Sequence, residues 1–291
     1  MTPRANILSP INALGTRWYF EFFEDISETL EQKIINQIHS FECSYSRFLS
    51  DSLLSILNKN KTLLGPPKEL QNMLKLGLKY YQKTNTVFTL SGERALSSTG
   101  YNDEYTFIAE KKRAEIPELS TSLEVSEQKI ILYNNASLDL GGIGKGFLID
   151  QIAQMLLKEE VQFFVINAGG DIFVTSDHGK PIELYLEHPT QKTSLIGSVC
   201  LQNQALAVSS PFKRAWKDSV TGVQYNHILS ENVVEFASFV IAETATEADV
   251  WATTLIAASE EQRSSFILPK TLSYKLLDKN AVTASSYNWP V

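Results

Sequence analysis

Two glycine-rich turns flank one apolar, helix-like segment in the middle of the chain, and this arrangement limits the folds that the sequence can adopt. The first turn lies in LDLGGIGKGFLID (138–150), and the second lies in NAGGD (167–171). Strand-like stretches precede the first turn and surround the second. This order brings the backbone amides of both turns to the same end of a sheet, where α/β units commonly bind ligands. For NAGGD alone, a plain hairpin turn is the alternative.

The lysine among the glycines raises the possibility of a phosphate-binding loop, but neither of the two best-known phosphate loops is present. A Walker A loop needs glycine five positions before Gly144 and Ser or Thr after Lys145, where this chain has Asp139 and Gly146. The dinucleotide fingerprint fails because Phe147 stands where its third glycine should be. Two alternatives remain. One is a non-standard anion cradle of backbone N–H groups, a helix N-terminus and a lysine, and the other is a strand-to-helix turn with a solvated lysine.

Composition excludes several functional classes. The 291 residues are 43% hydrophobic and 20% charged, which is typical of a globular protein with an ample core. A net charge of −7 argues against nonspecific nucleic-acid binding. Cys43 and Cys200 lack the spacing of a disulfide framework or a zinc site. We see no membrane span, signal peptide or lipobox, so we expect a cytoplasmic protein.

Apolar periodicity predicts alternating helices and strands. No linker or internal repeat divides the chain, so one domain over residues 1–291 is expected, with an irregular stretch at 89–128. Strands are expected at 13–24, 129–133 and 137–140 and on both sides of NAGGD, and helices at 27–40, 68–84, 146–158 and 246–258.

A carboxylate and a hydroxyl share one face of the last predicted helix. Thr244 and Glu247 form a plausible capping box, so this helix should begin near Ala245. Asp249 and Thr253 are four residues apart and therefore lie on the same face. Their oxygens suit Mg²⁺, which binds carboxylates together with waters and substrate phosphates. The alternative is that Asp249 complements the helix dipole and Thr253 only packs.

His227, in the strand-like run YNHIL, is a candidate general base. A neutral imidazole near pH 7 can take the proton of a hydroxyl nucleophile. The alternative is a histidine with a purely structural role in a strand. Neither a GxSxG nor an HExxH motif occurs, so serine-hydrolase and zinc-protease chemistry lack support.

Six stretches follow one another in an order that resembles the ApbE family, the FAD:protein FMN transferases. They are ALGTRW, SYSRFLSDSLLSILN, LDLGGIGKGFLID, VINAGGDIFV, NHI and ADVWATTL, and they cover about residues 13–258. The family's Leu-Gly-Gly-Ile-Ala-Lys-Gly-Tyr element is similar to the run from Asp139 to Asp150, with Gly144 in the alanine place and Phe147 in the tyrosine place. Its Asn-Ala-Gly-Gly-Asp element matches 167–171 without change. Its Ala-Asp-x-x-Ala-Thr element matches 248–253.

The resemblance implies an α+β fold, with mixed β-sheets and flanking helices in two interlocked lobes and FAD in the cleft between them. It implies an Mg²⁺-dependent transferase that splits the pyrophosphate of FAD. FMN would be attached through a phosphoester to a Thr or Ser hydroxyl of an acceptor flavoprotein domain, and AMP would leave. The expected partners are therefore FAD and the acceptor protein.

The resemblance also implies a role for each matching residue. Mg²⁺ would be held by Asp249, Thr253 and the backbone carbonyl of Gly144, and His227 would be the base for the acceptor hydroxyl. The residues expected to contact the pyrophosphate or the flavin nucleotide are Gly141, Gly142, Lys145, Asp150, Asn167, Gly169, Gly170 and Asp171.

Three departures from the family pattern concern the surfaces that face the acceptor and the flavin. Leu229-Ser230-Glu231 replaces an Asp-Pro element after His-Ile, Ser209-Ser210-Pro211-Phe212 replaces Thr/Ser-Ser-Gly-x-Tyr, and Phe88-Thr89-Leu90 replaces Phe-Asp-Pro. Two alternative functions therefore stay open. One is an FAD pyrophosphatase that yields FMN and AMP, and the other is a non-catalytic flavin-binding homologue.

Overall fold

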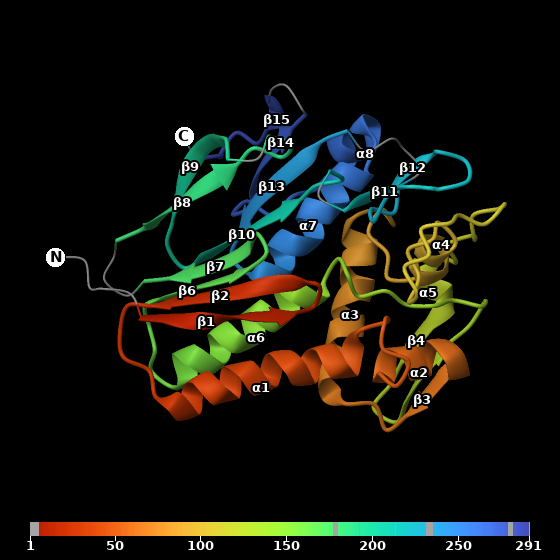
Figure 1. Ribbon diagram of the computed structural model, residues 1–291, viewed down its shortest axis with the longest axis horizontal. Helices are drawn as coiled ribbons and strands as arrows, with labels where there is room; N and C mark the ends of the chain where they lie inside the picture. The colour runs from red at the N-terminus through yellow and green to blue at the C-terminus, as the bar shows by residue number, and fades with distance from the viewer. Residues whose placement is uncertain are drawn as a thin grey trace.

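The computed structural model describes residues 6–176, 180–191, 193–212, 214–230, 235–278 and 282–290. An eight-stranded sheet forms its centre (Figure 1). In spatial order the strands are β1 (Asn6–Ala13), β2 (Thr16–Phe22), β6 (Phe164–Ala168), β7 (Asp171–Thr175), β10 (Gln204–Ser209), β13 (Ala237–Ala242), β14 (Ser273–Leu277) and β15 (Val282–Ser285).

The predicted α+β class is confirmed, but the sheets are not mixed: every strand pairing among the described residues is antiparallel. Tight turns account for part of this pattern, because a short turn joins antiparallel neighbours, as it does for β1 and β2 and for β6 and β7. NAGGD is such a turn, since it joins β6 to β7 with Ala168 opposite Asp171.

Three helices cover one face of the large sheet: α1 (Glu28–Tyr45), α6 (Gly144–Lys158) and α7 (Ala245–Ala257) (Figure 1). Side chains alternate between the two faces of a strand. Ile166 and Val240 accordingly join the hydrophobic cluster under the helices. Their chain neighbours Val165 and Ile241 join a second cluster on the other face. The hairpin of β8 (Ile182–Glu187) and β9 (Leu195–Leu201) covers that second face.

A smaller group of elements packs beside the large sheet and forms the second lobe (Figure 1). It contains α2 (Leu53–Asn60), α4 (Glu93–Ser97), α5 (Leu119–Ser122) and a sheet of β3 (Thr62–Leu64), β5 (Lys129–Leu132) and β4 (Leu123–Val125). The remaining elements are α3 (Lys68–Lys83), the pair β11 (Ala215–Lys217) and β12 (Gln224–Asn226), and α8 (Glu260–Ser265).

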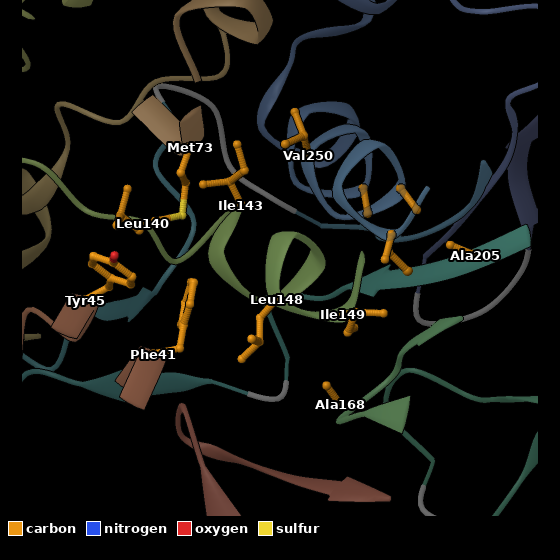
Figure 2. Packing of buried hydrophobic residues seen from close by; sticks show 14 of the residues in the cluster. Phe41, Tyr45, Met73, Leu140, Ile143, Leu148, Ile149, Ala168, Ala205 and Val250 are labelled. Carbon is orange, nitrogen blue, oxygen red and sulfur yellow. The ribbon is translucent and has the colours of Figure 1, made fainter. Parts of the chain in front are cut away.

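One hydrophobic cluster runs through both lobes and interlocks them. It includes Trp18 of the large sheet, Leu57 of α2 and Leu132 of β5. Figure 2 shows α6 at the centre of this packing, with Leu148 near Phe41 of α1 and Ile149 near Ala168 of β6. The start of α6 is therefore held from several sides.

The long helices are confirmed to within a few residues, whereas the strand expected at 137–140 is absent. The side chain of Asn58 explains its absence. It accepts from the N–H of Leu138 (2.7 Å) and donates to the carbonyl of the same residue (2.9 Å), so this backbone is satisfied without a neighbouring strand. The stretch 89–128, expected to be irregular, contains two short helices and β4. Within the described ranges, no helix has the length and apolarity needed to cross a bilayer.

Candidate active site

A cavity of about 830 Å³ lies where the N-terminal end of α6 and the side of α7 face the smaller lobe. This volume is within the ~300–1,000 Å³ typical of small-molecule sites. Charged, hydroxyl and aromatic side chains line it. They include Arg47, Tyr101, Lys145, Asp171, Ser209, Arg214, Trp216, His227, Asp249 and Thr253.

The glycine turn before α6 presents only some of its backbone N–H groups to the cavity. Those of Gly141 and Gly144 are engaged within the turn, by the Asp139 carboxylate (2.6 Å) and by a backbone carbonyl (2.7 Å). Within the part of the chain that the structure describes, the N–H groups of Gly142 and Lys145 have no such partner. These two donors, at the positive end of a helix, are the ones left for an anion.

Helices α6 and α7 cap each other at their N-terminal ends. Asp249 of α7 accepts from the N–H of Gly146 (3.1 Å), while Asp150 of α6 accepts from the N–H groups of Ala245 (2.7 Å) and Thr246 (2.9 Å). A Cβ at Gly146 would stand 2.4 Å from the carbonyl oxygen of Ala245, so only glycine permits this approach. Carboxylates at helix N-termini are stabilising. The junction therefore fixes Asp249 relative to the glycine turn.

A buried charge cluster occupies the floor of the cavity. The Lys145 ammonium contacts the carboxylate of Asp171 and lies 3.5 Å from that of Asp249. Burial alone would lower the pKa of Lys145, but the charges of Asp171 and Asp249 raise it above its ordinary value. Burial raises the pKa of Asp249 to about 6, against the opposing effect of Lys145. One ammonium is thus shared by two carboxylates. When both carboxylates are ionised, the cluster carries a net negative charge that attracts a further cation.

The oxygen atoms beside this cluster fit a hard dication. Gly144, Asp249 and Thr253 all line the cavity, and the Thr253 hydroxyl lies 3.0 Å from that of Ser209. Across the described ranges, no group of three or more His, Cys, Asp or Glu side chains could hold a metal. A set with one carboxylate and neutral oxygens suits Mg²⁺ that shares its coordination with substrate phosphates.

His227 follows β12 and lines the same cavity. Its Nδ1 lies 3.3 Å from the backbone carbonyl of Arg214, so an Nδ1–H donates there and Nε2 remains the basic nitrogen. Burial, followed by the positive charge of Arg214, lowers the pKa of His227 to about 4. The imidazole is therefore neutral at pH 7, as a base must be.

Five aromatic side chains form a second part of the cavity lining, which we call the aromatic wall. They are Phe48, Tyr101, Tyr105, Phe107 and Trp216. The rings of Tyr101 and Trp216 stack with centroids 5.2 Å apart, and Trp216 Nε1 donates to the carbonyl of Thr99 (2.9 Å). Planar rings of this kind can bind a flat aromatic ligand. Sequence reasoning missed this wall, although three of its aromatics cluster between positions 101 and 107.

Three residues that were expected to contact the ligand do not line the cavity: Asp150, Asn167 and Gly170. Asp150 caps α7, and Asn167 Oδ1 accepts from the N–H of Gly170 (3.0 Å) inside the NAGGD turn. Gly169 of the same turn does reach the cavity. Arg47, Ser209 and Arg214 also line it, although sequence reasoning gave none of them a role.

The departure from the family pattern after His227 is built into the packing. Leu229 fills the space beside Gly92, where a Cβ would stand 1.8 Å from its Cδ1 atom. Ser230 Oγ donates to the carbonyl of Ala257 (2.7 Å), which fastens the chain after His227 to the end of α7. Glu231 lies outside the described residues.

The sheet, its helical layer and this cavity define an α+β protein with one large cavity that is lined by charged, hydroxyl and aromatic side chains. A model of the ApbE family matches residues 14–273, and the chain belongs to that family.

The FAD:protein FMN transferase of Buchnera aphidicola (subspecies Baizongia pistaciae) is 23% identical, over 95% of this chain and 87% of the relative. The Escherichia coli K12 protein of the same name is 20% identical, over 91% and 81%. The crystal structure of the ApbE protein from Thermotoga maritima superposes with a TM-score of 0.79 at 19% identity, over 97% of this chain and 96% of that one.

Proposed function

We propose that the protein is an FAD:protein FMN transferase that requires Mg²⁺. The carrying observation is that one cavity joins two backbone N–H donors, which have no partner among the described residues, and a lysine to an oxygen-donor set and a neutral histidine. Those groups match a substrate pyrophosphate, a dication and a hydroxyl nucleophile respectively. The relatives bear the name of this activity.

The residues divide the work as follows. The N–H groups of Gly142 and Lys145 and the lysine ammonium bind the pyrophosphate of FAD. Asp249, Thr253 and the carbonyl of Gly144 would hold Mg²⁺, which when bound neutralises phosphate charge and makes phosphorus more electrophilic. The aromatic wall offers stacking surface to a flat ring system of the dinucleotide.

The transfer forms one bond and breaks one. His227 Nε2 takes the proton of a Thr or Ser hydroxyl on the acceptor flavoprotein domain. The hydroxyl oxygen bonds to the phosphorus of the FMN half, the pyrophosphate P–O bond to AMP breaks, and AMP leaves with its negative charge. Phosphoryl transfer depends mainly on positioning and charge stabilisation, which fits a site built on the N-terminal end of α6 and the side of α7.

The deciding experiment measures AMP released from FAD by the purified protein with Mg²⁺, with and without a candidate acceptor domain. AMP that appears only with acceptor, together with an acceptor mass increased by that of FMN less one water, supports the transferase. Free FMN and AMP without acceptor would instead identify an FAD pyrophosphatase. FAD binding without AMP in either condition would identify a non-catalytic flavin-binding homologue. The cytoplasmic location stays a prediction.

A further inference from the structure

Arg47 lies in the wall of the cavity, and the proposed chemistry gives it no role. It follows α1 in the stretch SYSRFLSD, and only 4% of its side chain is exposed. Its Nε lies 2.5 Å from the carboxylate of Asp139, and its Nη2 donates to the carbonyl of Tyr101 (2.8 Å). A weaker contact of 3.4 Å reaches the hydroxyl of Ser97. Burying a guanidinium is costly even when it is paired, so this position is not explained by stability alone.

The partner carboxylate connects Arg47 to the glycine turn. One oxygen of Asp139 pairs with Arg47, and the other accepts from the N–H of Gly141 at 2.6 Å. This side-chain-to-backbone bond closes an Asx turn at Asp139. The turn sets the orientation of the next N–H group, that of Gly142. Gly142 is one of the two donors without a partner in the described part of the chain. Arg47 therefore orients, through Asp139, a group that is available to an anion.

The same guanidinium also reaches the aromatic wall. Its central carbon lies 4.2 Å from the ring centroid of Phe48 and 5.1 Å from that of Tyr101. Both distances are within the range of cation–π attraction. The bond to the Tyr101 carbonyl fixes the backbone beneath one of these rings. The side chain of Arg47 thus contacts both Asp139, which holds the glycine turn, and the backbone of Tyr101, which carries one ring of the aromatic wall.

We propose that Arg47 is a positioning residue that sets the spacing between the glycine turn and the aromatic wall, so that one dinucleotide can engage both. This proposal rests on the proposed function, because FAD is the ligand with a pyrophosphate next to aromatic rings. In this proposal, Arg47 contacts neither the acceptor hydroxyl oxygen nor the phosphorus that it attacks. Loss of the residue should weaken FAD binding while saturated enzyme still turns over.

The first test compares FAD affinity in Arg47→Met, Arg47→Lys and Asp139→Asn, measured by flavin fluorescence titration. We expect Arg47→Met to weaken FAD binding about tenfold or more, the effect of one lost charge-assisted bond. Arg47→Lys should fall between it and the parent, because an ammonium can pair with Asp139 but cannot also reach the Tyr101 carbonyl. Lys33→Met is the matched control, since it removes a cation from an exposed ion pair with Glu159.

Ligands that resemble only one part of FAD can show whether Arg47 links the glycine turn to the aromatic wall or acts on one of them alone. Inorganic pyrophosphate and riboflavin each engage one surface, so Arg47→Met should weaken each of them less than it weakens FAD. Arg47→Met combined with Asp139→Asn should be no worse than Arg47→Met alone, because the two residues act as a unit. Equal losses for FAD and pyrophosphate, or additive effects of the two substitutions, would overturn the proposal.

Steady-state kinetics provide a second readout. The KM for FAD should rise in Arg47→Met while kcat stays within about threefold of the parent, as expected for lost ground-state and transition-state binding alike. A fall in kcat at unchanged KM would instead place Arg47 in the chemistry and contradict a positioning role.

Hydrogen exchange keeps the inference separable from the proposed function, because it needs no ligand. Amides of 138–146 should exchange faster in Arg47→Met than in the parent or in Lys33→Met, with far-UV circular dichroism unchanged. Unchanged exchange there refutes the positioning role. A parent protein that binds no FAD refutes the proposed function and leaves this exchange test to decide on Arg47. If Arg47→Met does not fold, Arg47→Lys carries the same comparisons.

Discussion

At the scale of single residues, we propose His227 as the general base, because it lines the cavity and its Nδ1 lies against the carbonyl of Arg214. Replacement by alanine should leave FAD binding intact and slow FMN transfer by about 10² or more, the usual loss for a general base. Single-turnover transfer to an acceptor, at FAD concentrations that saturate both proteins, measures this directly. Transfer at the parental rate would return His227 to a structural role.

The same residue predicts a stability change with pH. The pKa of His227 is lowered from 6.5 to about 4 in the folded protein by burial and by Arg214. Between these values the unfolded chain binds the extra proton, so stability is fully present above pH 6.5 and is lost as pH falls towards 4. As pH falls across that window, the free energy of unfolding should decrease by about 1–3 kcal/mol less in His227→Gln than in the parent. Urea unfolding at both ends of the window tests it, and parallel curves would contradict it.

Asp249 supplies the only carboxylate among the three expected metal ligands. Asp249→Ala should abolish AMP release, and in the parent Mg²⁺ binding should weaken as pH falls through about 6, because the carboxylate must be ionised to bind. Titration calorimetry with Mg²⁺ and a non-hydrolysable FAD analogue at two pH values measures the second effect. Near-normal turnover of the variant would remove Asp249 from the metal site.

Local pattern predicted part of this site and could not predict the rest. Asp249 and Thr253 were placed together correctly because both lie on one helix, where spacing alone fixes the face. Arg47 meets Asp139 across 92 positions of sequence, and this pairing depends on tertiary packing that a local pattern does not encode. The aromatic wall was missed for the same reason, since Tyr101 and Trp216 are 115 positions apart in the chain and meet only in the folded structure.

At the scale of secondary-structure elements, the mutual capping of α6 and α7 should contribute measurably to stability. Asp150→Ala removes the acceptor for two N–H groups of α7, and we expect it to cost about 1–3 kcal/mol of unfolding free energy. Chemical denaturation measures the change. Asp51→Ala is the control, because Asp51 is exposed and such substitutions stay within about 0.5 kcal/mol. Equal stability of the two variants would mean that the caps contribute nothing.

Element prediction succeeded where apolar periodicity was long. Helices α1, α3, α6 and α7 were expected and are present, because each has an extended apolar face or a clear cap. The strand at 137–140 was wrong because Leu138 and Leu140 alternate in a strand-like way while Asn58 satisfies the backbone. A side chain in place of a neighbouring strand has no signature in local periodicity.

At the scale of the whole molecule, the shared hydrophobic cluster predicts cooperative unfolding. Residues of both lobes belong to it, so neither lobe can expose its core without disrupting the other. We expect coincident transitions in urea by near-UV and far-UV circular dichroism, which is also the test of the one-domain prediction. Two separated transitions would show that the lobes unfold independently.

Four of the five aromatic-wall residues come from two segments that are bonded to each other: the stretch 99–109 and the hairpin of β11 and β12. Trp216 bonds to Thr99, and the Asp218 carboxylate accepts from the N–H of Ala109 (2.6 Å). The groups that we propose for phosphate and metal lie instead at α6 and α7, whose N-terminal ends cap each other. Substitutions can therefore accumulate in these two segments without disturbing the junction of α6 and α7. Duplicated copies of such a gene could diverge in the molecules they recognise while inheriting one reaction.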